Sequence, residues 1–169
     1  YVALAERLRS QGALLLVAMS GLSGGGKSTV ALCLAERVGG VRIRSDVERK
    51  RLFGLASSMA SGGSIYTADA NEKTYARLEQ CAKFGLAAGV PVIIDAAALR
   101  RDERLRFRDV ARELGAQFAL VVCSAPADVL RARVAARAAA GTDPSEADLD
   151  VLERQLDWYE APGADEEAW

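Results

Sequence analysis

The most regular feature of the sequence is a set of short apolar segments separated by longer amphipathic ones. The segments expected to form strands are Leu14–Ser20, Val41–Arg44, Val90–Asp95 and Phe118–Cys123. Three of the four are nearly continuous apolar runs, which is typical of strands buried on both faces of a sheet.

Between these segments, apolar residues recur every three or four positions, a spacing typical of helices that pack through one face. The expected helices cover residues 2–9, 27–38, 47–53, 68–88, 101–114, 126–139 and 145–159. Glycines at 39, 89 and 115 stand where helices are expected to end. The Ser- and Gly-rich stretch Gly54–Thr67 and the shorter Gly141–Pro144 are expected to be loops.

Strands alternate with helices along the chain, which predicts an α/β fold with a mostly parallel sheet of about four or five strands. Helices on both faces would make a three-layer α/β/α arrangement. In such sheets, ligands bind at the carboxyl ends of the strands. Three expected strands lead to Gly21, Asp46 and Asp95, so these residues become the first candidates for a functional site.

Length and composition narrow the classes of function. A chain of 169 residues fits one domain, and a net charge of −1 argues against a generally basic surface that coats nucleic acid. The longest apolar stretch, Ala13–Met19, is too short to span a membrane. Three widely spaced cysteines form no metal or disulfide pattern, which favours the cytoplasm. The chain has no histidine, so any proton acceptor must be a carboxylate, a lysine or water.

The segment after the first expected strand matches the phosphate-loop pattern G-x-x-x-x-G-K-[ST]. The residues expected to surround the phosphates of ATP are Gly21, Leu22, Ser23, Gly24, Gly25, Gly26, Lys27, Ser28 and Thr29. Glycines allow successive backbone N–H groups to face an anion, and the following helix adds the positive end of its dipole. Lys27 would contact the β- and γ-phosphates, and the Ser28 hydroxyl would bind Mg²⁺. The fold class expected is therefore a P-loop NTPase.

A carboxylate and an arginine follow the second expected strand. Asp46 can face the γ-phosphate and accept a proton from a substrate hydroxyl. Arg49, three residues on, shares its helical face and can hold the substrate or the phosphoryl group. The alternative is that Asp46 caps a solvated, charged helix, and capping is compatible with catalysis.

Two further groups complete the candidate site. Asp95 ends an apolar strand and suits magnesium, usually bound through water, although a strand-end cap is the alternative. Arg133 and Arg137 lie one helical turn apart before Gly141, in a helix that also carries Arg131. Arginines in this position suit a small helical lid that closes over the phosphates, whereas the alternative is a solvated helix face.

Taken together, GLSGGGKST, Asp46-x-x-Arg49, the VIID that ends at Asp95 and Arg133-x-x-x-Arg137 resemble a P-loop kinase group. That group contains polynucleotide 5′-kinases, gluconate kinase-like enzymes and chloramphenicol phosphotransferase-like enzymes. The resemblance covers about residues 1–158 and is closest to ATP-binding kinase domains that are often fused behind an aminoglycoside-phosphotransferase-like domain. The missing initiator methionine before Tyr1 would then mark a piece of a longer chain.

The resemblance implies a single P-loop kinase domain over residues 1–169, with residues 137–146 as the lid loop. It implies ATP and Mg²⁺ as ligands, with Lys27 and Ser28 as the phosphate and magnesium residues. Asp46 becomes the general base, Arg49 a substrate clamp, and Arg133 and Arg137 the lid arginines.

Three functions remain open at this point. The leading one is a cytoplasmic kinase that phosphorylates a hydroxyl group of a small molecule, with no membrane association. A second is a kinase for nucleic-acid 5′-ends, with a basic groove made of Arg42, Arg44, Arg49, Lys50, Arg51, Arg100, Arg101 and Arg104. Aromatic residues for base stacking are scarce among them, which disfavours this function. A third is an ATP-binding regulatory module with little turnover.

Overall fold

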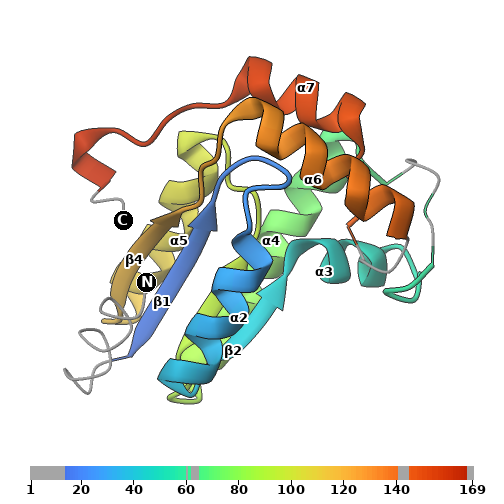
Figure 1. Ribbon diagram of the computed structural model, residues 1–169. Coiled ribbons are helices and arrows are strands. Elements are labelled where there is room, and N and C mark those ends of the chain that lie inside the picture. Colours follow the sequence, from blue (N-terminus) through green and yellow to red (C-terminus); the bar gives the residue numbers. More distant parts are fainter. Residues whose placement is uncertain (1–13, 60, 62–64, 141–144, 167–169) are drawn as a thin grey trace.

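The structure is a computed structural model that describes residues 14–59, 61, 65–140 and 145–166 (Figure 1). Its strands are β1 (Leu15–Ser20), β2 (Val41–Arg44), β3 (Val92–Asp95) and β4 (Gln117–Val122). Its helices are α2 (Lys27–Val38), α3 (Ser45–Leu52), α4 (Ala68–Ala87), α5 (Arg101–Glu113), α6 (Ala127–Ala140) and α7 (Leu149–Trp158), and a 3₁₀ turn η1 (Ala164–Glu166) follows. The helix expected at residues 2–9 and the loop at residues 141–144 lie outside the described residues.

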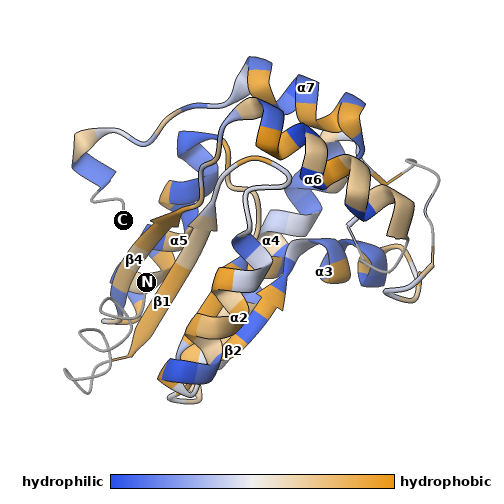
Figure 2. Cartoon of the chain, in the orientation of Figure 1, coloured by the Kyte–Doolittle hydropathy of each residue, from blue (hydrophilic) through white to orange (hydrophobic). Residues whose placement is uncertain are grey.

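The four strands form one parallel sheet in the order β2-β3-β1-β4. β1, which leads into the phosphate loop, is therefore flanked on both sides, and Ala18 pairs with Ile94 of β3 and Leu120 of β4. Figure 2 shows β1 as hydrophobic along its length, as expected of a central buried strand. The predicted parallel sheet is confirmed.

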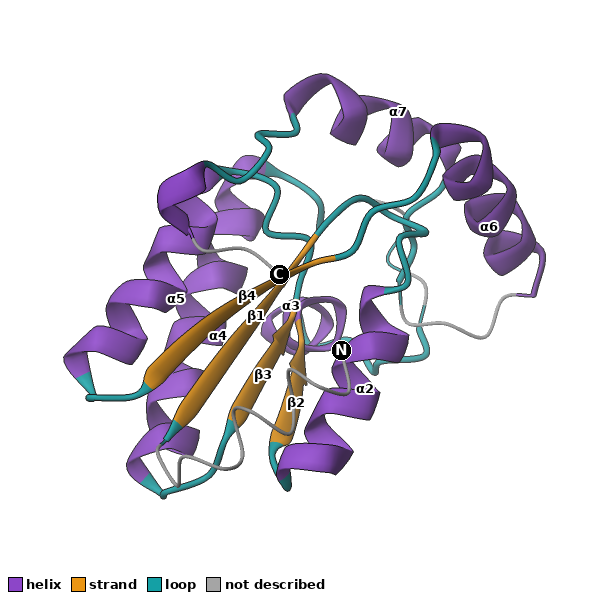
Figure 3. Cartoon of the chain, turned by 60° about the vertical axis from the view of Figure 1, so that its left-hand side comes forward, coloured by secondary structure: helices purple, strands orange, loops and turns teal. Residues whose placement is uncertain are grey.

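Helices cover both faces of the sheet, so the predicted three-layer α/β/α arrangement is confirmed. On one face, Leu16 and Ala18 of β1 pack with α4 and α5 in a core that includes Leu78 and Phe107. On the other face, Leu15, Val17 and Met19 pack against α2, whose Leu34 is buried. Figure 3 shows α6 and α7 beyond the carboxyl ends of the strands, on the side where ligands of such sheets bind.

The last helix begins later than the sequence pattern suggested, at Leu149 instead of residue 145. The side chain of Asp148 accepts a hydrogen bond from the Val151 N–H at 2.9 Å and thereby caps the helix start. The preceding Glu146 is engaged elsewhere, because its carboxylate accepts hydrogen bonds from Ser61 and pairs with Lys50 at 2.9 Å. None of the described helices has the length and apolar composition needed to cross a bilayer.

Candidate active site

The phosphate loop connects β1 to α2 and takes a conformation that requires glycine. Gly21, Gly24 and Gly26 all have positive φ, at 137°, 81° and 88°. A Cβ on Gly21 would also lie 2.2 Å from the carbonyl oxygen of Cys123, which follows β4. A Cβ on Gly24 would lie 2.8 Å from the Leu130 carbonyl oxygen of α6, so φ and space both favour glycine at 21 and 24, whereas at Gly26 φ alone does.

Lys27 is the first residue of α2 and borders the pocket described below. Its Nζ donates a hydrogen bond to the Leu22 carbonyl at 2.8 Å, which folds the side chain back over the loop. Burial lowers the pKa of Lys27, and the nearby carboxylates of Asp95 and Asp46 oppose this shift. Both carboxylates therefore lie close enough to act on the ammonium group.

Ser28 and Asp95 lie together at the carboxyl end of β3. The Asp95 side chain hydrogen-bonds to Ser28, and burial raises the pKa of its carboxyl group above the ordinary value in spite of that bond and of Arg44. Arg44 Nε lies 3.6 Å from Asp95 Oδ2, but this buried oxygen has no hydrogen-bond partner among the described residues.

A hydroxyl beside a carboxylate with an unpartnered oxygen fits Mg²⁺, which usually binds one or two carboxylates and takes its other ligands from phosphates and water. The described residues contain no group of three or more His, Cys, Asp or Glu side chains that could hold a metal. An ion at Ser28 and Asp95 would therefore need phosphate oxygens or water to complete its coordination.

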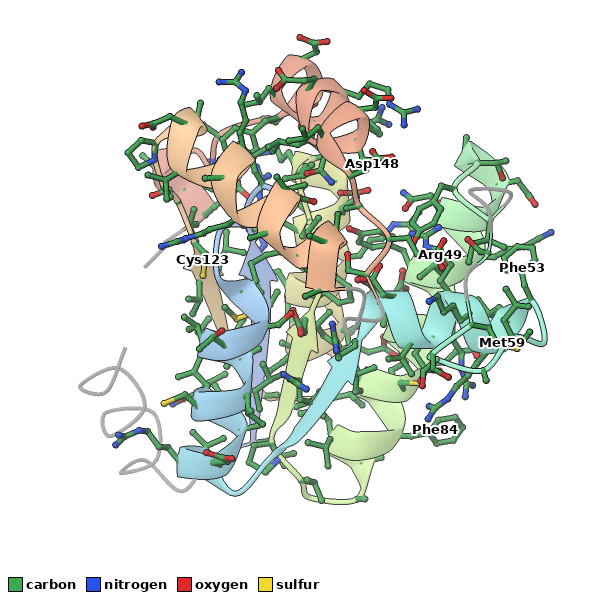
Figure 4. All side chains as sticks on the ribbon, turned by 45° about the vertical axis from the view of Figure 1, so that its right-hand side comes forward. Arg49, Phe53, Met59, Phe84, Cys123 and Asp148 are labelled. Carbon is green, nitrogen blue, oxygen red and sulfur yellow. The ribbon has the colours of Figure 1, made fainter. Side chains whose placement is uncertain are left out.

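Asp46 and Arg49 project from α3 into the same pocket. Burial raises the pKa of the Tyr66 hydroxyl to about 12, and the negative charge of Asp46 adds to this increase. The Asp46 carboxylate therefore lies near that hydroxyl. Arg49 is only 6% exposed, and Figure 4 shows it beside the start of α4. Its terminal nitrogens donate to Asn71 Oδ1 at 3.0 Å and to the Ile65 carbonyl at 3.3 Å, while Nε has no partner among the described residues.

One pocket of about 410 Å³ brings most of the predicted groups together. The predicted residues that border it are Ser23, Lys27, Ser28, Asp46, Arg49, Asp95 and Arg137. Thr29 is exposed on α2 and does not border it. The pocket thus brings Ser23, Lys27 and Ser28 of the phosphate loop together with two of the predicted carboxylates and two of the predicted arginines.

The arginines of α6 have different surroundings although they share a helix. Arg137 borders the pocket and donates to the Ala147 carbonyl at 2.7 Å. Arg133 is exposed, does not border the pocket, and donates to the Gly24 carbonyl at 3.2 Å. Arg131 forms an exposed ion pair with Glu153 of α7. Of the predicted lid arginines, only Arg137 faces the site.

Several residues that border the pocket were not found from the sequence. Tyr66, Asn71 and Glu103 come from the loop before α4 and from α4 and α5, and Gln155 and Trp158 come from α7. Gln155 Oε1 accepts a hydrogen bond from the Ser23 N–H at 2.9 Å, which ties α7 to the phosphate loop. The signal available in the sequence was the spacing of Val151, Gln155 and Trp158 on one helical face.

The chain is similar to known proteins in sequence and in fold. A family model described as an AAA domain matches residues 16–162, and the chain belongs to that family. Its fold and phosphate loop are those of a P-loop kinase domain. No protein with a curated functional description matches the sequence.

Solved structures share the fold over most of their length. A sugar kinase from Janibacter sp. HTCC2649 is 25% identical, with 92% of this chain and 83% of that chain covered and a TM-score of 0.69. A gluconokinase from Sinorhizobium meliloti 1021 is 24% identical, with 91% and 79% covered and a TM-score of 0.65. The APS kinase of Mycobacterium tuberculosis, solved with AMPPNP and APS, is 22% identical, with 89% and 84% covered and a TM-score of 0.63.

Proposed function

We propose that this P-loop kinase domain transfers the γ-phosphoryl group of Mg·ATP to a hydroxyl group of a small molecule. The observation that carries the proposal is the single pocket bordered by Lys27, Asp46, Arg49, Asp95 and Arg137. Its volume of about 410 Å³ lies in the range of small-molecule sites. The sugar kinase and gluconokinase with the same fold support an alcohol as acceptor.

In the proposed reaction, the acceptor oxygen attacks the γ-phosphorus, a new O–P bond forms, and the bond to the β-phosphate oxygen breaks. The proton of the acceptor hydroxyl passes to the Asp46 carboxylate, which borders the pocket in a chain without histidine, while the second carboxylate near Lys27, Asp95, is assigned to Mg²⁺. ADP is the leaving group, and the phosphate loop and Lys27 neutralise its negative charge.

The remaining groups position the reactants. Mg²⁺ held by Ser28 and Asp95 would neutralise charge on the phosphates. Arg49, fixed by Asn71 and Ile65, would orient the acceptor, and Arg137 would stabilise the charge that develops on the transferred phosphoryl group.

The polynucleotide 5′-kinase remains the second candidate, and two observations bear on it. Most of the basic residues suggested for a groove are engaged: Arg42 and Arg44 face Asp95, Arg101 pairs with Asp165, and Arg104 is buried. In favour of this candidate, the exposed aromatic residues Tyr66 and Trp158 border the pocket. Because bases can stack on aromatic rings, a nucleic acid is included among the acceptors to be tested.

The proposal is tested by measuring ADP formation from Mg·ATP with and without added acceptor. The panel contains sugars, sugar acids, aminoglycosides, chloramphenicol-like alcohols and a 5′-hydroxyl oligonucleotide. We expect ADP to form only with a particular small alcohol and in equal amount to its phosphorylated product. ATP loss at the same rate without acceptor would show an ATPase or a regulatory module instead.

A further inference from the structure

Helix α7 forms one wall of the pocket and lies beyond the carboxyl ends of the strands (Figure 3). Val151, Arg154, Gln155 and Trp158 all border the pocket, and their spacing places them on one helical face. The opposite side of α7 is anchored, because Leu152 is fully buried in a cluster with α6. The hydrogen bond from Ser23 to Gln155 fixes the same helix to the phosphate loop. The wall is therefore held in place before any acceptor binds.

At the end of this wall, an arginine lies against an aromatic ring. Trp158 is 48% exposed, and Arg100 Cζ lies 5.2 Å from the centre of its ring. Arg100 is the residue before α5, so the two side chains come from different sides of the pocket. Stacking on an indole fixes the guanidinium group and leaves its N–H donors available for other partners.

The other arginines that border the acceptor side are already bonded to the protein. Arg106 pairs with Glu72 at 2.6 Å and with Glu79 at 3.2 Å. Both terminal nitrogens of Arg49 are bonded to Ile65 and Asn71. Their remaining capacity to bind a ligand is therefore small, apart from Arg49 Nε.

Arg100 and Arg154 differ from these two. Across the described ranges, neither has a carboxylate within ion-pair distance, and the Arg154 guanidinium donates only to the Asp150 carbonyl at 3.2 Å. The carboxylates nearest to Arg100 in sequence accept hydrogen bonds from backbone N–H groups and from Asn71. Asp102 accepts from the Glu103 N–H, and Glu103 accepts from Asn71 and from the Arg100 backbone N–H. Neither of these two cationic groups beside Trp158 forms an ion pair with a described residue, although Glu72, Asp102 and Glu103 also border the pocket.

We propose that Arg100, held against Trp158, and Arg154 form an anion-binding subsite in the acceptor half of the pocket. The acceptor then carries a carboxylate or a phosphate in addition to the hydroxyl that is phosphorylated. This inference rests on the proposed function, in which the pocket holds an acceptor. Since hydrogen bonds between ionised partners are about twice as strong as neutral ones, the charged member of a matched pair of alcohols binds about tenfold more tightly or better.

The test measures binding directly through the fluorescence of Trp158. The chain has two tryptophans, so a Trp169→Phe background makes Trp158 the only one. With the nucleotide site filled by Mg·AMPPNP, two matched pairs are titrated: gluconate against glucose, and adenosine 3′-phosphate against adenosine. The first pair tests a sugar-acid source of the negative charge, and the second tests a phosphate ester.

The substitution tested is Arg100→Met, which keeps an unbranched chain over the indole and removes the charge. The matched control is Arg112→Met near the end of α5, the helix that Arg100 precedes, where the arginine is exposed and pairs with Asp109. We expect the anionic member of at least one pair to bind about tenfold more tightly than its neutral partner. Arg100→Met should remove that preference, Arg154→Met should weaken it, and Arg112→Met should leave it unchanged. Equal binding of both members, no binding of either anion, or an unchanged preference in Arg100→Met would overturn the subsite.

The subsite and the proposed function fail in different ways. A neutral alcohol that supports full ATP turnover, insensitive to Arg100→Met, would overturn the subsite and leave the kinase function standing. An anion preference that depends on Arg100, in a protein whose ATP turnover needs no acceptor, would support the subsite and overturn the kinase function.

Discussion

The two ends of the pocket are built in different ways. The backbone of the phosphate end is one continuous segment, residues 21–28, in which Gly21 and Gly25 lie against Cys123 at the end of β4. The acceptor end is assembled from side chains of α3, α4, α5 and α7 together with the loop before α4. A backbone nest tolerates few changes in sequence, whereas a wall of side chains from five segments can change its specificity one residue at a time.

The ends also differ in how their charges are balanced. At the phosphate end, Lys27 lies within the influence of Asp46 and Asp95, and burial raises the pKa of Asp95 and lowers that of Lys27. At the acceptor end, Arg106 is neutralised by carboxylates while Arg100 stacks on Trp158. Burial therefore disfavours the charged forms of Lys27 and Asp95 at the phosphate end, whereas Arg100 and Arg154 at the acceptor end form no ion pair with a described residue.

The largest expected effect separates chemistry from binding. Asp46→Asn should lower phosphotransfer by about 10²–10⁴-fold, because the variant loses a positioned base. Mg·ATP affinity should stay nearly unchanged, since the phosphate loop is intact. Single-turnover kinetics and nucleotide titration measure the two quantities. An active Asp46→Asn variant would leave Asp46 as an acidic residue in the first turn of α3 with no role as the base.

The next prediction concerns the buried ion pair between Arg104 and Glu166, which holds α5 against the segment that follows α7. Arg104 is 1% exposed, and its guanidinium donates to both oxygens of Glu166 and to the carbonyls of Leu99 and Glu160. Glu166→Gln leaves this buried cation without its carboxylate and should lower the free energy of unfolding by about 3–5 kcal/mol. Urea denaturation measures the change.

The control for that prediction is Asp165→Asn, which removes an exposed partner of Arg101 from the same segment. Exposed pairs contribute little, so its urea midpoint should match that of the unchanged protein. Equal urea midpoints for Glu166→Gln and Asp165→Asn would mean that the buried ion pair does not stabilise the fold.

A smaller effect should distinguish the two predicted lid arginines of α6, Arg133 and Arg137. Arg137→Ala should lower the turnover rate by about 10–100-fold with a modest change in the KM for ATP, because its charge acts mainly in the transition state. Arg133→Ala should be nearly neutral, since Arg133 is exposed and its one hydrogen bond to a described residue goes to the Gly24 carbonyl. Melting temperatures should agree within a degree or two for both, as alanine is a good helix former. Full activity in both variants would remove the lid role.

The smallest expected effect concerns stability at the phosphate end. Because burial raises the pKa of the Asp95 carboxyl, the folded state favours the protonated form. The corresponding stabilisation is complete below the unfolded-state pKa and is lost as the pH rises through the folded-state pKa. Asp95→Asn should therefore melt above the unchanged protein at pH 7, with a gap that narrows toward pH 4. Asp69→Asn, at an exposed position on α4, should show no such gap. A lower Tm for Asp95→Asn at pH 7 would contradict the cost assigned to this carboxylate.

The sequence predicted the fold and the phosphate end because both depend on local patterns. Apolar runs and glycine spacing located β1, β3 and β4 almost to the residue, and GLSGGGKS defined the loop. At the acceptor end, the sequence suggested Arg49 as a substrate clamp and Arg100 as a groove residue, but it did not predict Tyr66, Asn71 or Trp158, because these side chains meet only after the chain folds.

Side-chain direction accounts for the differences that remain. Arg133 and Arg137 have the expected spacing, but only contacts across the fold determine which of them faces the pocket. The late start of α7 depends on a capping bond from Asp148 and on the engagement of Glu146 with Lys50 and Ser61.

The measurement that tests the account most directly is a calorimetric titration of Mg·ATP into the protein and into Lys27→Ala. Lys83→Ala is the matched control, because Lys83 is an exposed lysine on α4 that pairs with Glu113. We expect binding with one site per chain, retained in Lys83→Ala and abolished in Lys27→Ala with an unchanged melting temperature. Equal affinity for Mg·ATP in Lys27→Ala would contradict the assignment of residues 21–28 as the phosphate-binding loop.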